Sequence, residues 1–206
     1  MNRGRLITIE GIDGAGKTTL TVGLLEALRA RGIEVELLRE PGGVPAAERI
    51  RELVIDPDLQ VTARTEALLY AAARAQLVEE GIEPRLSGGT WLLLDRFIDS
   101  SLAYQGGGRR LGIEAVRAIN EFAIRTAWPD RTLLLVIDPR LGRSRSRSRA
   151  AVPDRLEREQ DDFFARTVDA YLELAAHDPT RIRKIDAGQP PEAVLAAALR
   201  DLADLL

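Results

Sequence analysis

The 206-residue sequence has no cysteine, a single histidine, and only two lysines among its 29 basic residues. Without cysteine the chain forms neither disulfide bonds nor thiolate metal sites, although this leaves its redox compartment open. The lone His177 stands in a His-Asp-Pro sequence, where a helix-terminal role is the simplest interpretation. No Ser-His-Asp or Cys-His arrangement can be assembled, and this excludes the common nucleophilic hydrolases.

Long apolar runs and a strong charge excess are also absent. No run approaches membrane-spanning length, and residues 1–5 lead into the first predicted strand without an apolar segment of signal-peptide length. We therefore expect a cytoplasmic protein with no membrane partner. A net charge of -3 and dispersed basic residues argue against a nucleic-acid partner. The length fits a single domain over residues 1–206 with a full core.

One stretch carries a specific chemical pattern. Residues 11–18 match the phosphate-binding loop G-x-x-x-x-G-K-[ST], and they directly follow an apolar run at residues 6–9. Such a loop turns its N–H groups and the N-terminus of the next helix toward a polyphosphate. Lys17, one of the two lysines, then bridges the outer phosphates, and the Thr18 hydroxyl can bind Mg²⁺. The predicted nucleotide-binding residues are Gly11, Ile12, Asp13, Gly14, Ala15, Gly16, Lys17, Thr18 and Thr19.

Hydrophobic periodicity predicts strands that alternate with helices along the chain. The strands are expected over 6–9, 33–38, 91–94, 133–137 and 182–185. The helices are expected from the loop to about residue 31, then over 46–54, 62–80 with a stop at Gly81, 113–126 after a glycine turn at 106–108, 156–176 and 190–205. Strands that are apolar on both faces predict an α/β fold, with a parallel sheet covered by helices on both sides.

Polar groups follow several of these strands, at the edge where such sheets bind ligands. They are the loop at 11–18, Arg39-Glu40, Asp95-Arg96 and Asp138. Asp95 is a candidate Mg²⁺ partner, with capping of the next helix as the alternative. Arg96 can bind a phosphate through two parallel hydrogen bonds.

Tyr70 and Arg74 are four residues apart on a predicted helix and share one face. The ring can stack on a nucleobase while the guanidinium donates to an exocyclic carbonyl oxygen. Spacing by itself favours a surface Tyr–Arg pair or a half-buried tyrosine.

The repeat at residues 143–149 alternates arginine and serine. A mobile arginine loop can close on phosphates and stabilise charge during transfer. A nucleic-acid arm and a solvated charge run are the alternatives. Because the repeat follows a predicted sheet strand, we favour the closing loop.

Taken together, these residues resemble the bacterial thymidylate kinases, from about residue 6 to the C-terminus. Five blocks carry the resemblance: residues 10–19, 39–43, 70–77, 95–106 and 143–157. The resemblance implies a P-loop kinase with a five-stranded parallel sheet and an arginine-rich lid at about 140–155. It also implies ATP-dependent conversion of dTMP to dTDP with Mg²⁺, in a homodimer. A nucleotide monophosphate needs no general base, because it is already largely dianionic at neutral pH.

The resemblance also assigns roles to single residues. The catalytic set would be Lys17, Arg96 and arginines of the lid, because the phosphate loop itself contains no arginine; Arg143, Arg145, Arg147 or Arg149 would act. Asp13 would hold the deoxyribose 3′-hydroxyl or the metal environment, and Tyr104 would crowd the 2′ position. The remaining substrate-binding residues would be Arg39, Arg51 and Arg96 at the phosphate, Glu40 near the acceptor site, and Tyr70, Arg74, Ser101 and Gln105 at the base.

Two other function classes remain open. One is a deoxynucleoside kinase or another nucleoside monophosphate kinase on the same scaffold. A nucleoside kinase would need a base for a neutral 5′-hydroxyl. The other is a switch-type NTPase, although no guanine-reading N-K-x-D pattern is present.

Overall fold

The computed structural model describes residues 3–147, 155–156 and 158–206. Within these residues the strands are β1 (Leu6–Glu10), β2 (Val35–Arg39), β3 (Trp91–Asp95), β4 (Arg131–Val136) and β5 (Ile182–Asp186). The α-helices are α1 (Lys17–Arg29), α2 (Pro45–Ile55), α3 (Ala63–Leu77), α4 (Glu83–Ser87), α5 (Ile98–Ser101), α6 (Ile113–Ile124), α7 (Pro139–Arg147), α8 (Asp161–His177) and α9 (Pro191–Asp201). Two π-helical segments, η1 (Val78–Ile82) and η2 (Leu102–Gly108), extend α3 and α5.

The strands form one parallel sheet in the order β2-β3-β1-β4-β5. β1 lies at the centre, with β3 on one side and β4 on the other, so the strand order reverses there. In sheets of this kind the crevice beyond the carboxyl end of such a strand is where ligands bind. The phosphate-binding loop follows β1 and therefore sits at the middle of the functional edge.

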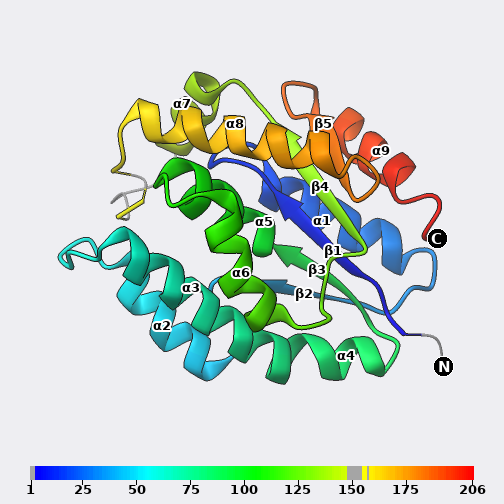
Figure 1. Ribbon diagram of the computed structural model, residues 1–206. Helices are drawn as coiled ribbons and strands as arrows, with labels where there is room; N and C mark the ends of the chain where they lie inside the picture. Colours follow the sequence, from blue (N-terminus) through cyan, green and yellow to red (C-terminus); the bar gives the residue numbers. More distant parts are fainter. Residues whose placement is uncertain (1–2, 148–154, 157) are drawn as a thin grey trace.

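Side chains of the strands alternate between two cores, one on each face of the sheet. Ile7 and Ile9 of β1 pack with α1 and α9, whereas Leu6 packs with the helices of the opposite face. Those helices include α3, α4, α6 and α8, which lie across the front of the sheet in Figure 1, with α1 behind it. The predicted three-layer α/β fold with a five-stranded parallel sheet is therefore confirmed. None of the helices formed by the described residues is long and apolar enough to cross a membrane.

The predicted helix stop at Gly81 is wrong. The chain continues from α3 through η1 into α4, and Gly81 is buried in the middle of η1. A side chain at this position would place its Cβ 2.9 Å from Leu77 Cδ1 and 3.5 Å from Val44 Cγ1. The closest atom belongs to Leu77, one turn earlier in the same continuous helical stretch, so a side chain at position 81 would require the Leu77 side chain to move. Glycine is accommodated inside the helix despite its low helix propensity.

The predicted glycine turn at 106–108 is also wrong, because these residues belong to η2. A Cβ at Gly107 would lie 2.4 Å from Ala170 Cβ of α8, and one at Gly108 would lie 2.6 Å from Phe163 Cε2. The glycines therefore allow two helices to approach each other closely. Helix boundaries differ too: α8 begins at Asp161 instead of 156, α6 ends at Ile124, and α9 ends at Asp201.

Candidate functional site

The phosphate-binding loop joins β1 to α1 through glycines in the left-handed region. Gly14 has a φ of 81° and Gly16 a φ of 96°, values that other residues rarely adopt. Lys17 opens α1, and its Nζ donates to the carbonyl oxygens of Gly11 at 3.1 Å and Ile12 at 3.2 Å. Burial lowers the pKa of Lys17. The lysine is thus folded back over the loop, at the place where phosphate oxygens would be bound.

Helix α7, which carries the arginine–serine repeat, begins directly beside this loop. A Cβ on Gly14 would lie 1.9 Å from Gly142 O, and a Cβ on Gly142 would lie 2.9 Å from Asp13 O. Only a pair of glycines allows this contact between the two backbones. Asp138 caps the helix by accepting hydrogen bonds from the N–H groups of Arg140 and Leu141.

Arg96 lies directly after β3 and reaches across to the phosphate-binding loop. Its φ of 70° is a left-handed conformation that is unusual for a residue with a side chain, and such strain collects at functional sites. The guanidinium donates to Gly11 O at 3.1 Å, Asp13 Oδ1 at 2.6 Å and Tyr104 OH at 3.3 Å. Burial by itself would raise the pKa of Asp13, but the charges of Arg96 and Lys17 lower it to about 2. Asp13 therefore stays ionised between the two cations.

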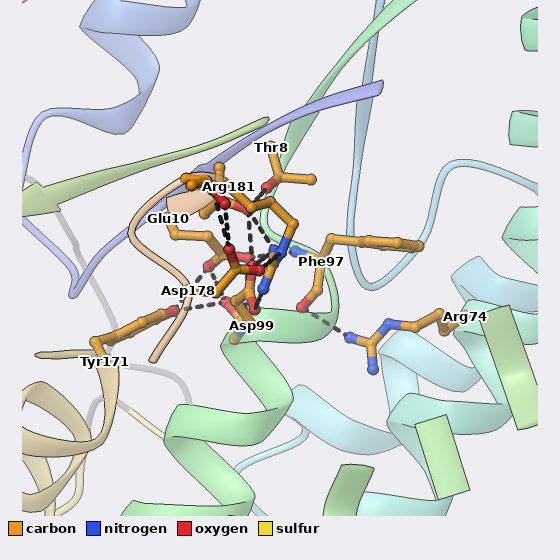
Figure 2. A network of polar contacts seen from close by, with 11 residues as sticks. Thr8, Glu10, Arg74, Phe97, Asp99, Tyr171, Asp178 and Arg181 are labelled. Carbon is orange, nitrogen blue, oxygen red and sulfur yellow. Dashed lines mark hydrogen bonds and ion pairs between the residues drawn. The ribbon is translucent and has the colours of Figure 1, made fainter. Parts of the chain in front are cut away.

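Glu10, the last residue of β1, is a fully buried carboxyl group that holds the segment around Arg96 in place through hydrogen bonds. Its Oε1 accepts from Phe97 N at 2.7 Å, and its Oε2 accepts from Ser100 Oγ at 2.6 Å and Tyr171 OH at 2.7 Å. Ser100 Oγ in turn accepts from Arg96 at 3.2 Å. Figure 2 shows Glu10 between Tyr171 of α8 and the Phe97 backbone. Glu10 thus joins β1, the Arg96 segment and α8 below the site.

A second buried carboxylate near Glu10, that of Asp99, forms an ion pair with Arg181. Asp99 accepts from Thr132 Oγ1 at 2.8 Å and from Arg181 Nη1 at 2.7 Å, and Arg181 also bonds Asp178 (Figure 2). Burial, with a further contribution from the negative charge of Asp99, raises the pKa of Glu10 to about 7.

A cavity of about 140 Å³ opens beside the loop at the carboxyl edge of the sheet. Its lining combines charged groups with rings, an amide and aliphatic groups. Its walls are formed by Asp13, Glu40, Pro41, Arg51, Ile55, Tyr70, Arg74, Arg96, Ser100, Ser101, Tyr104, Gln105 and Leu156. All the residues predicted to bind substrate lie in this list except Arg39. Pro41, Ile55, Ser100 and Leu156 complete the walls; only Ile55 lies outside the five blocks of the resemblance, and none of the four had been assigned a role.

Arg74 is part of the cavity wall, and its side chain is fully buried. Its hydrogen bonds all go to protein groups in the described region. The guanidinium pairs with Glu40 and donates to Ser101 Oγ at 2.9 Å, to Phe97 O at 3.0 Å and to the side-chain oxygen of Asn120. These contacts use every N–H of the group. Burial raises the pKa of Glu40 even though Arg74 opposes it. Contact of Arg74 with a base stays a prediction, and it requires one of these bonds to be shared.

Arg39 lies elsewhere. Its exposed guanidinium pairs with Glu48 at 3.0 Å, and it does not line the cavity. Arg51 does line it, and donates to Pro41 O at 2.9 Å.

These features were compared with known proteins. A family model described as thymidylate kinase matches residues 9–198, which is nearly the whole chain. The chain belongs to the thymidylate kinase family. Curated thymidylate kinases resemble it closely along their full length. That of Alkalilimnicola ehrlichii is 45% identical over 98% of this chain and 94% of the relative. That of Alcanivorax borkumensis is 48% identical over 93% of this chain and 92% of the relative.

A kinase that binds ATP needs positive charge beside the phosphates, and a metal ion or arginine side chains can supply it. Asp95 Oδ1 is buried and accepts no hydrogen bond from any described residue, and Thr18 is exposed in the first turn of α1. An orphaned carboxylate oxygen and a hydroxyl next to the phosphate-binding loop fit Mg²⁺, which is held by one or two protein oxygens together with substrate phosphates.

The lid arginines predicted for this kinase family are only partly described. The repeat is helical as far as Arg147, and Arg145 Nη1 donates to Ala187 O at 3.3 Å. Arg149 lies outside the described residues, as do the side chains of Arg143 and Arg147.

Proposed function

We propose that the protein transfers the γ-phosphoryl group of ATP to dTMP and forms dTDP. The observation that carries this proposal is the cavity beside the phosphate-binding loop. Arg96, which reaches the loop, lines it together with Tyr70 and Gln105. A nucleoside monophosphate likewise combines an anionic group with a planar polar base.

The proposal assigns the walls to parts of the acceptor. Arg96 and Arg51 bind its phosphate, because guanidinium groups match phosphate oxygens in geometry and charge. Tyr70 stacks on the base, which Ser101 and Gln105 contact from the side. Tyr104, buried against Arg96, narrows the space at the sugar and so disfavours a 2′-hydroxyl. A further set of predicted contacts comprises Asp13 at the 3′-hydroxyl or in the metal environment, Glu40 near the acceptor site and Arg74 at the base carbonyl.

For the phosphoryl donor, the proposal places ATP on the phosphate-binding loop and adds Mg²⁺ and the lid. Residues 11–19 bind ATP, with Lys17 on its outer phosphates; Thr18 and Asp95 would hold Mg²⁺, which would supply positive charge beside the phosphates. Residues 140–155 form the lid of this single domain, and Arg143, Arg147 or Arg149 brings further charge to the transferred group. The start of α7 against Gly14 supports this role, because it fixes the base of the lid at the loop. The proposed location is the cytoplasm, where both nucleotides are available.

A coupled ADP-release assay tests the function. ATP and Mg²⁺ are supplied with dTMP, dUMP, dCMP, dGMP or thymidine in parallel. We expect strong preference for dTMP. Preference for thymidine would instead indicate a deoxynucleoside kinase, and ADP release that is independent of any acceptor would favour the switch-type NTPase.

We further propose that two copies of the chain associate through the outer face of α3 and α6, which pack against each other. Phe122 of α6 is 87% exposed and Leu68 of α3 is 57% exposed, an unusual exposure for such large apolar groups on adjacent helices.

Phe122→Glu would place one carboxylate from each copy near the contact between them, if that contact is symmetric. We expect it to weaken dimerisation at least about thirtyfold in sedimentation equilibrium. Val22→Glu, which likewise replaces an exposed apolar side chain by a carboxylate but lies on α1, serves as the control. A monomeric wild-type protein would contradict the proposal.

A further inference from the structure

Glu66, in the first turn of α3, is a fully buried carboxylate that lies beside the acceptor cavity and outside its lining. It accepts hydrogen bonds from three residues, two of them from η2 and its C-terminal end. Gln105 Nε2 of η2 lies 2.8 Å from Oε1, and Arg109 Nη2 lies 3.0 Å from Oε2. Arg155 Nη1, at the end of the proposed lid, lies 2.7 Å from Oε2. A buried carboxylate with this many partners organises its surroundings, because each partner would lose a charged acceptor if it were removed.

The contact with Gln105 fixes which way its amide faces. A carboxylate that already accepts from two guanidinium groups can only accept, so Gln105 must present its NH₂ group to it. The amide oxygen Oε1 is then the atom directed to the other side. Gln105 is itself part of the cavity wall and is almost completely buried. The orientation of its amide therefore follows from the charge of Glu66 and not only from packing.

The contact with Arg155 fixes another part of the wall. Arg155 also donates from Nε to Val54 O at 2.9 Å and from its backbone N to Ile55 O at 3.4 Å. The next residue, Leu156, lines the cavity together with Ile55. Glu66 thus anchors the end of the lid segment on the last turn of α2.

We propose that Glu66 is a positioning residue for recognition of the acceptor base: it turns the Gln105 carbonyl oxygen toward the cavity and holds Leu156 in the wall. The inference rests on the proposed function and deepens it. Thymine carries a hydrogen-bond donor at N3, which an amide oxygen accepts. Cytosine has an acceptor at N3, which an amide oxygen repels. A fixed Gln105 therefore selects a base with an N3–H group over cytosine.

The test is Glu66→Gln, which keeps the shape of the side chain and removes its charge. Its amide can both donate and accept, so Gln105 is no longer held in one orientation. We expect the ratio of kcat/KM for dTMP to that for dCMP to fall about tenfold, mainly through a higher KM for dTMP. The KM for ATP should change by no more than about twofold. Glu36→Gln, which removes a partly exposed ion pair with Arg85, is the matched control and should leave the ratio unchanged.

Gln105→Met supplies a second test that leaves Glu66 and its arginines in place, and it decides the matter if Glu66→Gln does not fold. We expect it to lower the same ratio, and Glu66→Gln added to it should cause no further loss. The proposal is overturned if Gln105→Met keeps the wild-type ratio, or if folded Glu66→Gln loses activity on both acceptors equally. A wild-type protein that does not phosphorylate dTMP would instead refute the proposed function.

Discussion

Lys17→Ala is expected to lower the turnover of dTMP by about 10² to 10³-fold, the cost of removing one preorganised charged donor from a phosphoryl-transfer site. Nζ of Lys17 lies over the loop on the carbonyl oxygens of Gly11 and Ile12, and Asp13 Oδ1 is 3.6 Å away. In the proposed function, this charge acts on the transferred group. Alanine has the highest helix propensity, so α1 should form without the lysine. The coupled ADP-release assay at saturating dTMP and ATP measures the loss.

The chain supplies its own control, because Lys184 is the only other lysine. It is exposed on β5, and Lys184→Ala removes the same charge without touching the loop. We expect its turnover to stay within about twofold of wild type, and circular dichroism should show both variants folded. A folded Lys17→Ala variant with wild-type turnover would refute the role given to the loop.

The layers of the fold could be predicted because they depend on short patterns. The apolar strands and the loop after β1 are local features, and a parallel sheet buried on both faces follows from them. Gly81 and Gly107 show where this reasoning stops. Glycine is usually interpreted as a break, but Gly81 lies inside a continuous helical stretch and Gly107 permits a contact with Ala170 of α8. A contact between segments far apart in sequence leaves no mark on the local pattern that predicts a turn.

The residues of the site could likewise be predicted from the sequence only in part. Glu40 and Arg39 are adjacent and were expected together, yet only Glu40 lines the cavity. Successive side chains of an extended segment point to opposite sides, so Arg39 is exposed and pairs with Glu48 instead. Ile55 and Leu156 could not be predicted as neighbours, because only the folded chain brings the end of α2 to the segment after the lid.

Glu10 is expected to make the free energy of unfolding fall as the pH rises from about 4.5 to 7. Burial, helped by the charge of Asp99, raises its pKa from 4.5 to about 7 in the folded protein. Between these values the unfolded chain loses the proton while the folded chain keeps it, so rising pH favours unfolding. Each pH unit costs about 1.4 kcal/mol, and the whole window costs about 3 kcal/mol. Asp13 does not contribute in this window, because its pKa of about 2 confines its effect to lower pH.

Glu10→Gln removes this ionisation but keeps the hydrogen bonds of a protonated carboxyl. The amide oxygen can accept from Phe97 N, and the amide nitrogen can donate to Tyr171 OH or Ser100 Oγ, as the protonated oxygen of Glu10 would. Urea unfolding at pH 5, 6, 7 and 8 gives the difference in stability between the variant and wild type, from which all other titrating groups cancel. We expect this difference to shift in favour of the variant by about 3 kcal/mol between pH 5 and 8. A difference that does not vary with pH would mean that Glu10 ionises in the folded protein as readily as in the unfolded chain. The segment around Arg96 would then be hydrogen-bonded to a Glu10 carboxylate that is charged at every pH tested.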